Sequence, residues 1–314
     1  MTERTESENM RNDILHLPLA KQRELDRVVE MLFQGFREAT ENATGRRKSG
    51  RILKIILFGS YARGDWVDAP LDANQYKSDY DILIIVNQKE LSDRTDYWED
   101  TEQRLIDAYL FEKTLRTPVN FIVHSLQDVN DALTHGRLIF FEIVKDGAIL
   151  YESNDRALKT PKPKTPEQTY QTTKDYFDEY FSNSQEFYEA FQDAIRRGRL
   201  KNAAFQLHQT TEPLYQCALL VRTLYTPFDH NIEFLRSLAE GQEPSLFDVW
   251  PRGTRVERAM FQKLKDAYRK ARYSKHYKIS REELEWLGAR VEELGRRVFD
   301  ISTARLAELE KKLI

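Results

Sequence analysis

The chain has 314 residues, 40% of them hydrophobic and 32% charged, with a formal net charge of −3. That length allows two domains, each with its own core, and the composition is typical of a folded, soluble protein. The slightly acidic balance argues against a general nucleic-acid binder. No segment approaches the roughly 20 apolar residues of a membrane span, and the polar N-terminus lacks a signal-peptide pattern. With one cysteine in the chain, we expect a cytoplasmic protein without disulfides.

The first half of the chain mixes helix and strand signals. Residues 1–14 are polar and predict a disordered tail, and the elements after it predict an α/β domain over residues 15–151. The expected elements, in chain order, are a helix at Pro18–Ala43, strands at Ile52–Phe58 and Asp81–Val86, a long charged helix between Glu90 and Leu115, a strand at 117–125, a helix at 126–133, and a closing strand with its turn within 137–151.

The second half of the chain differs in character from the first. Residues 152–165 are rich in proline and lysine and offer little to bury, which predicts a linker. Capping-box patterns at Thr165 and Ser280 mark helix starts, and residues 166–314 show little strand signal. This half therefore predicts an all-α bundle, with helices near 166–195, 199–225, 231–239, 255–272 and 281–312.

Two short motifs in the first half carry the candidate chemistry. Asp79 and Asp81 are two apart at the start of a strand, which places both carboxylates on one face. Converging carboxylates favour a hard divalent cation such as Mg²⁺, which completes its shell with substrate phosphates. Gly59 and Ser60 end the preceding strand, where a residue without a Cβ lets backbone N–H groups approach a phosphate. Arg63 follows one helical turn later, placed to neutralise phosphate charge.

The stretch "GSYARGD…SDYDILI" resembles the G-S-x-A-R-G…S-D-x-D pattern of the DNA polymerase β-like nucleotidyltransferase superfamily. The resemblance implies an α+β domain with a mixed sheet that binds ATP or another NTP together with Mg²⁺ or Mn²⁺. It also implies that a hydroxyl attacks the α-phosphorus while pyrophosphate leaves. The residues implied as nucleotide contacts are Gly59, Ser60, Arg63 and Ser78, and those implied as metal ligands are Asp79 and Asp81.

The third carboxylate of that family is replaced in this chain. Asn120 stands where the family usually has an aspartate that helps hold the metal and accepts the proton of the attacking hydroxyl. An amide can ligate through its carbonyl oxygen but cannot act as a base. His124 lies four residues on, on the same strand face, and is either an alternative base or a strand-end histidine exposed to solvent. A catalytically inactive nucleotide sensor is therefore an alternative to an enzyme.

The helical half resembles the HEPN domain, named for its occurrence in higher eukaryotes and prokaryotes and for nucleotide binding. The resemblance lies in "FQLHQTTEPLYQCALLV", "DHNIEFLRSLAEG" and "LKDAYRKARYSKHYKI". Many HEPN proteins are metal-independent RNases, and their arginine–histidine motif corresponds to Arg269 and His276. A basic patch from Pro251 to Lys278, with ten Lys or Arg against two acidic residues, is where RNA would bind. His208 and Glu212, four apart, predict a structural hydrogen-bonded pair.

The two halves together suggest a joint function. In some bacterial toxin–antitoxin pairs, a minimal nucleotidyltransferase silences its HEPN partner by adding AMP to a tyrosine near the histidine, and Tyr273 and Tyr277 flank His276 here. We therefore expect a Mg²⁺-dependent, toxin–antitoxin-like nucleotidyltransferase that modifies a hydroxyl, such as that of a protein tyrosine. The alternatives are a HEPN RNase with a regulatory nucleotide-binding domain and an aminoglycoside-type enzyme with a small-molecule acceptor. Expected partners are a nucleotide, RNA at the basic patch, and a second copy of the HEPN domain, but no membrane.

Overall fold

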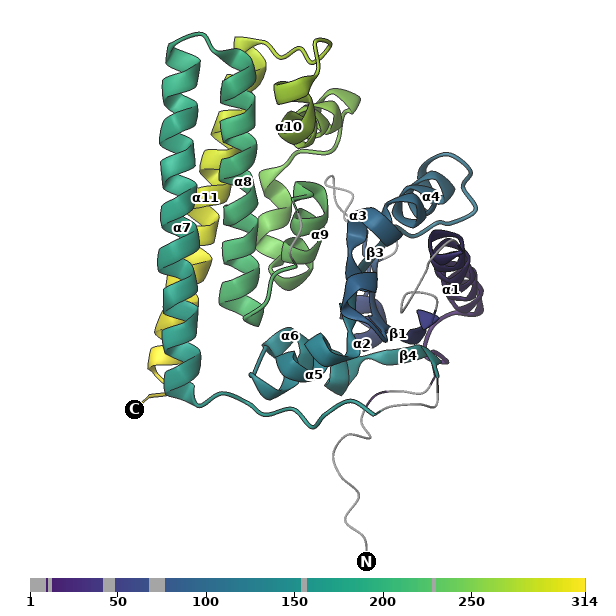
Figure 1. Cartoon of the computed structure of the whole chain (residues 1–314). Coiled ribbons are helices and arrows are strands. Elements are labelled where there is room, and N and C mark those ends of the chain that lie inside the picture. The colour runs from purple at the N-terminus through teal and green to yellow at the C-terminus, as the bar shows by residue number, and fades with distance from the viewer. Residues whose placement is uncertain are drawn as a thin grey trace, which may run out of the picture. The chain divides into compact units, whose positions relative to one another are not determined.

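The structure is a computed structural model that describes residues 10, 13–41, 49–67, 77–153, 157–227 and 230–313. Most of the predicted tail at residues 1–14 lies outside the described residues. The described chain divides into two compact units, with the division between Pro163 and Lys164. Figure 1 shows the elements of both units.

The first unit contains a four-stranded sheet with the strand order β3-β2-β1-β4. Strand β1 (Ile52–Phe58) pairs antiparallel with both β2 (Tyr80–Val86) and β4 (Ala148–Glu152), whereas β2 pairs parallel with β3 (Val119–Ser125). The sheet is therefore mixed, and the expected α+β fold is confirmed. The pairing brings the C-terminal end of β1 beside the N-terminal ends of β2 and β3, so three chain segments meet at one end of the sheet.

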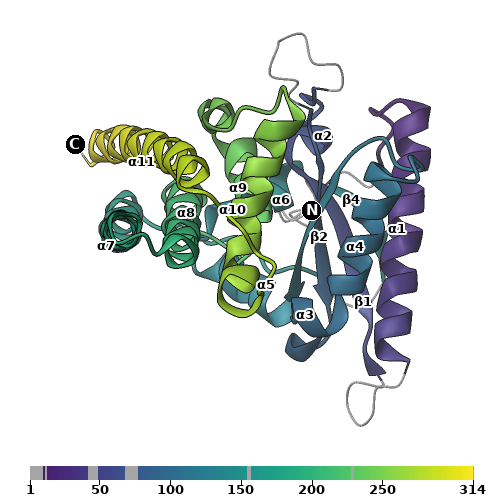
Figure 2. The ribbon, with the colours of Figure 1, turned by 90° about the horizontal axis from the view of Figure 1, so that it is seen from above.

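Helices cover both faces of this sheet, as Figure 2 shows. All of β1 is buried, because a strand with helices on both sides has no face left for water. One face packs against α1 and α4, and the opposite face packs against α5 and α6. The helices of this unit are α1 (Leu19–Thr40), α2 (Gly59–Arg63), α3 (Arg94–Tyr97), α4 (Glu99–Leu110), α5 (Leu126–Thr134) and α6 (Leu138–Asp146), together with a 3₁₀ turn, η3 (Lys89–Ser92).

Two predictions for this unit were wrong. The long helix expected between Glu90 and Leu115 is broken into η3, α3 and α4. One break lies at Asp93 and the other at Trp98, whose fully buried indole donates a hydrogen bond of 2.8 Å to the carbonyl of Leu91. The strand and turn expected within 137–151 are a helix, α6, followed by the short strand β4. Packing on the sheet favours the helix, because the buried residues Ile139, Phe140, Ile143 and Val144 recur at helical spacing.

The second unit is a helical bundle, as expected from the sequence. Helices α7, α8 and α11 run side by side over most of their length (Figure 1), and α9 and α10 pack against α8. Capping boxes start α7 at Thr165, α10 at Thr254 and α11 at Ser280. The elements are α7 (Pro166–Arg196), α8 (Leu200–Thr223), α9 (Ile232–Gln242), a 3₁₀ turn η4 (Pro244–Val249), α10 (Arg255–Tyr273) and α11 (Arg281–Glu310).

The bundle has an apolar core that contains the cysteine of the chain. Cys217 on α8 is fully buried, and burial raises the pKa of its thiol to about 12. At neutral pH it therefore behaves as a small core residue rather than as a nucleophile. Within the described part of the chain, none of the helices is both long enough and apolar enough to cross a bilayer.

Candidate functional site

A glycine turn at the end of β1 forms the first wall of the candidate site. Phe58 is extended, whereas Gly59 has φ of 73°, a left-handed conformation that side chains disfavour. Gly59 is the first residue of the short helix α2. Gly64, which caps the other end of this helix, is also in the left-handed region. A Cβ atom at Gly59 would lie 2.4 Å from Oδ2 of Asp81. The turn therefore faces the carboxylate directly, and the absence of a side chain makes this approach possible.

The second wall is formed by the N-terminal ends of β2 and β3. The strand register places Asp81 between Phe58 on one side and Asn120 on the other. Asp79 immediately precedes β2, and its Oδ2 accepts a hydrogen bond of 2.9 Å from Nδ2 of Asn120. The Asn120 side chain also hydrogen-bonds to the carboxylate of Asp81. The two predicted metal ligands and the predicted third position thus form one cluster opposite the glycine turn.

The electrostatics of this cluster favour a cation. Burial, together with the charge of Asp79, raises the pKa of Asp81 to about 8, although the Asn120 hydrogen bond and the Arg63 charge act in the opposite direction. Two carboxylates that disfavour each other's ionisation are stabilised by a divalent cation, and oxygen ligands suit Mg²⁺. Among the described residues, no group of three or more His, Cys, Asp or Glu side chains could hold a metal. Asp79 and Asp81 are the residues of this cluster that could hold such an ion.

The remaining predicted nucleotide contacts divide into two kinds. Ser60 and Arg63 lie on α2 beside Gly59, and the exposed Arg63 side chain donates a hydrogen bond of 3.2 Å from Nε to Asp65. Ser78 is buried, and its hydroxyl accepts a hydrogen bond of 2.9 Å from the backbone N–H of Val67. Its own N–H donates to the carbonyl of Val67 at 2.9 Å. Ser78 therefore holds the chain ahead of the acidic pair, while Ser60 is half-buried and Arg63 is exposed on α2.

The structure places His124 away from the cluster. It lies opposite Ile85 in the register, four residues and about 13 Å along the strand from Asn120. Its ring meets Phe140 edge-on, with a centroid separation of 5.5 Å, and burial lowers its pKa to about 4. His124 is thus neither the exposed strand-end histidine nor a base within reach of the acidic pair.

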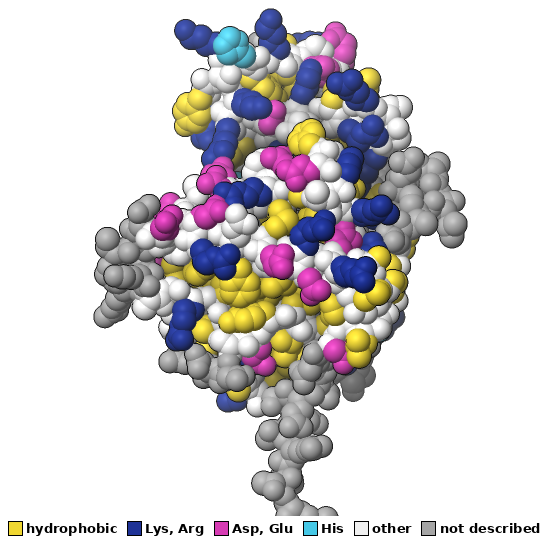
Figure 3. Space-filling model, turned by 90° about the vertical axis from the view of Figure 1, so that its right-hand side faces the viewer, with side chains coloured by type: hydrophobic (Ala, Val, Ile, Leu, Met, Phe, Trp, Pro, Cys, Tyr) yellow, Lys and Arg dark blue, Asp and Glu magenta, His cyan; other side chains and the backbone are white. Residues whose placement is uncertain are grey.

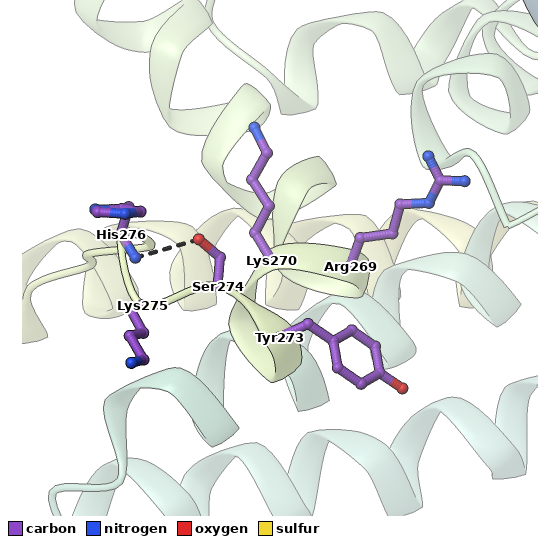
Figure 4. Close-up of a pocket in the computed structure, with 6 residues that line it drawn as sticks. All are labelled: Arg269, Lys270, Tyr273, Ser274, Lys275 and His276. Carbon is purple, nitrogen blue, oxygen red and sulfur yellow. Dashed lines mark hydrogen bonds between the residues drawn. The ribbon is translucent and has the colours of Figure 1, made fainter.

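The predicted arginine–histidine pair lies on a separate surface of the second unit. A hollow at the end of α10 is lined by Arg269, Lys270, Tyr273, Ser274, Lys275 and His276. Figure 4 shows the Arg269 and His276 side chains pointing away from each other rather than into a common centre. The backbone N–H of His276 donates to Oγ of Ser274 at 3.2 Å. The structure therefore does not bring the two groups of the predicted RNase motif together.

The two predicted modification sites have opposite environments. Tyr273 is 79% exposed, at the last residue of α10. Tyr277 is 7% exposed, and its hydroxyl donates a hydrogen bond of 3.0 Å to the carbonyl of Lys263. Burial raises the pKa of the Tyr277 hydroxyl. Of the two hydroxyls, only that of Tyr273 is placed to meet an incoming reagent.

Basic side chains surround Tyr273. Arg272 lies over its ring at 5.1 Å, and Lys270 and Lys275 line the same hollow. Figure 3 shows Lys and Arg side chains gathered around a histidine in the upper part of the view, at the height of α10. Several positive charges gathered in one place attract an anionic partner, such as a nucleotide phosphate.

The His208–Glu212 pair is looser than the sequence predicts. The Nδ1–Oε2 distance is 4.0 Å, whereas Nδ1 of His230 lies 2.8 Å from Oε1 of Glu212. The rings of both histidines stack on Tyr268, at 5.2 and 5.0 Å. His230 precedes α9, and its part in this cluster was missed because its separation from Glu212 follows no helical spacing.

Comparisons with known proteins agree with this architecture. Residues 45–156 match the family model described as polymerase beta, nucleotidyltransferase, and residues 177–300 match the HEPN domain model. The chain therefore carries a polymerase β-type nucleotidyltransferase domain followed by a HEPN domain.

A protein of Methanocaldococcus jannaschii, named "Putative protein adenylyltransferase MJ0604", is 52% identical to this chain over 44 residues. That stretch covers 14% of the present chain and 36% of the relative, so the chain spans about a third of the length of the relative it matches.

Proposed function

We propose that the first unit transfers a nucleoside monophosphate from an NTP to a hydroxyl group. The observation that supports this most strongly is the approach of the Gly59 turn to Asp81, with Asp79 and Asn120 completing the cluster. This arrangement offers bare backbone on one side and two carboxylates on the other, which suits a metal-bound triphosphate. The name of the M. jannaschii relative supports ATP as the donor.

The chemistry exchanges a phosphoanhydride bond of the NTP for a phosphodiester bond to the acceptor. The acceptor oxygen forms a bond to the α-phosphorus, the bond from that phosphorus to the bridging oxygen breaks, and pyrophosphate leaves. When bound by Asp79 and Asp81, Mg²⁺ supplies charge neutralisation and polarises the phosphate oxygens. Arg63 adds positive charge on the side of α2. The hydroxyl proton passes to a carboxylate or to water, because the amide of Asn120 cannot accept it.

The acceptor we propose is the hydroxyl of Tyr273. It is exposed, it lies among cations that attract a bound nucleotide, and Tyr277 is excluded by its buried hydrogen bond. Transfer to Tyr273 can occur within one chain or between two copies. Attachment of AMP would add negative charge to the basic hollow and weaken its attraction for RNA or another polyanion.

The test is incubation of the full-length chain with ATP and Mg²⁺, followed by intact-mass measurement and a pyrophosphate assay. We expect one AMP per chain, lost in Asp79→Asn and Asp81→Asn and retained in Asp26→Asn, which removes an exposed carboxylate of α1. Pyrophosphate release without a protein adduct would point to a small-molecule acceptor. An adduct that persists in Asp81→Asn would contradict the proposal.

A second candidate function rests on Asn120. A site with an amide in the third position can bind a metal–nucleotide complex without turning it over, which makes the first unit a nucleotide sensor. Such a chain gains thermal stability with Mg·ATP, loses this gain in Asp81→Asn, and releases no pyrophosphate. The same pair of measurements therefore separates the sensor from the transferase.

A further inference from the structure

A buried polar network lies on the face of the sheet opposite to the carboxylates. Side chains alternate along a strand, so Tyr80 points away from its neighbours Asp79 and Asp81 and into the core that α1 covers. Tyr80 is fully buried, as are Tyr61 of α2 and Thr117 ahead of β3. Helix α1 contributes two charged side chains to this core, Lys21 and Glu24, which are 10% and 9% exposed.

Glu24 ties the start of β3 to the start of β2. Its Oε1 accepts hydrogen bonds from the backbone N–H groups of Arg116 and Thr117, the latter at 2.9 Å. Its Oε2 accepts from the hydroxyls of Thr117 at 3.1 Å and Tyr80 at 3.0 Å. One carboxylate thus holds four donors from two chain segments that are far apart in sequence.

Lys21 connects this hydrogen-bonded network to α2. Its ammonium donates a hydrogen bond of 2.8 Å to the hydroxyl of Thr117. It also lies 5.3 Å from the ring centroid of Tyr61 and 5.9 Å from that of Tyr80, and these two rings are in contact at 4.5 Å. A buried ammonium beside two aromatic faces and a carboxylate is held firmly, because each partner offsets part of its desolvation.

The three segments joined by this network are those that carry the candidate site. Tyr61 directly follows Ser60, Tyr80 separates Asp79 from Asp81, and Thr117 lies three residues before Asn120. We propose that Lys21 and Glu24 are positioning residues that fix the spacing of the Gly59 turn, the acidic pair and Asn120. This inference rests on the proposed function, and it assigns to α1 a role that goes beyond covering the sheet.

The test compares metal affinity with activity in matched variants. Glu24→Gln removes the charge but keeps the side-chain shape, and Tyr80→Phe removes only the hydroxyl bonded to Glu24. The control is Lys54→Met, because Lys54 is 3% exposed, pairs with Glu152, and lies at the other end of β1 from Gly59. The probe is Mn²⁺, whose dissociation constant is measured by electron paramagnetic resonance on the full-length chain, together with the half-saturating Mg²⁺ concentration for pyrophosphate release.

We expect Glu24→Gln to weaken Mn²⁺ binding about tenfold, since outer-shell partners tune ligand placement. Tyr80→Phe should act in the same direction more weakly, and excess metal should restore turnover in both. Lys54→Met should leave the Mn²⁺ affinity unchanged even if it lowers the melting temperature. Wild-type Mn²⁺ affinity in Glu24→Gln and Tyr80→Phe, or an equal loss in Lys54→Met, overturns the positioning role. A wild-type chain that binds Mn²⁺ but releases no pyrophosphate overturns the proposed transfer instead, and one that binds no Mn²⁺ overturns both.

Discussion

A Cβ atom added to Gly59 would lie 2.4 Å from Oδ2 of Asp81, closer than real Cβ contacts come. The glycine directly follows β1 and the carboxylate lies on β2, and the pairing of Phe58 with Asp81 brings them together. This contact defines the candidate site, because it places bare backbone directly against an acidic side chain.

Gly59→Ala should reduce nucleotidyl transfer by about two orders of magnitude. The new methyl group meets the Asp81 carboxylate, and the left-handed backbone adds a strain of about 1 kcal/mol. Gly64→Ala is the matched control, since Gly64 has φ of 91° but the nearest atom to its added Cβ would be Cδ2 of His16, at 3.9 Å. The measurement is the initial rate of pyrophosphate release. If both variants lose the same fraction of this rate, backbone strain alone explains the loss and the contact with Asp81 does not.

Asn120→Asp should destabilise the metal-free chain and stabilise the metal-bound one. The substitution replaces the hydrogen bond to Asp79 with a third negative charge, at a cost of about 1–3 kcal/mol. We expect a melting temperature lower by about 3 °C or more without Mg²⁺, and a larger rise on adding Mg·ATP than in the wild type. Differential scanning fluorimetry measures both. If the variant is instead more stable than the wild type without metal, a third carboxylate at position 120 is not repelled by Asp79 and Asp81.

Tyr273→Phe should abolish the AMP adduct, whereas Tyr277→Phe should retain it. The Tyr277 hydroxyl donates a hydrogen bond to the Lys263 carbonyl. Removing this hydroxyl should therefore lower the free energy of unfolding by about 1 kcal/mol. Peptide mapping after the ATP incubation locates the modified residue. An adduct on Tyr277, or one that survives in Tyr273→Phe, would show that exposure in the structure does not select the acceptor.

The stability of the chain should fall below about pH 6.5 through His208. Burial, with smaller contributions from the charges of His230 and Arg272, lowers the pKa of His208 to about 3. The folded chain therefore keeps this ring neutral at pH 5, while the unfolded chain binds a proton near pH 6.5. A folded pKa below the unfolded one means that stability is complete above pH 6.5 and is lost as the pH falls.

The loss between pH 7 and pH 5 from this group is about 2 kcal/mol. Urea unfolding at the two pH values measures it, and His208→Gln should reduce the difference by about that amount. Glu212 and His230 face the same ring and are present in both chains, so the double difference between wild type and variant isolates His208. An unchanged difference in the variant would show that His208 binds its proton equally in both states.

Most of the elements could be predicted from sequence periodicity, and the errors have a common cause. The run Leu138–Asp146 is rich in Ile and Phe, which favour strands, but its burial against the sheet follows helical spacing. The charged stretch after Lys89 has the composition of one helix, but it is interrupted at Asp93 and at Trp98, whose buried indole bonds to the carbonyl of Leu91. In both cases, tertiary packing outweighs local propensity.

The candidate site was predictable where its residues form a motif. Gly59 belongs to one short motif and Asp79 and Asp81 to another, and Asn120 could be placed by its position on the next strand. The network of Lys21 and Glu24 could not be predicted, because their partner Thr117 lies more than 90 residues away and the three residue types match no motif. The position of His276 relative to Arg269 likewise depends on the turn after α10 and not on the arginine–histidine spacing.

The most direct test of the central claim is Mg²⁺-dependent pyrophosphate release from ATP by the full-length chain, compared with Asp81→Asn. We predict release that requires the metal and falls at least about a hundredfold in the variant, because Asp81 lies between the glycine turn and Asn120. Release that is independent of Mg²⁺ or unaffected by Asp81→Asn would contradict the assignment of this cluster as the nucleotidyl-transfer site.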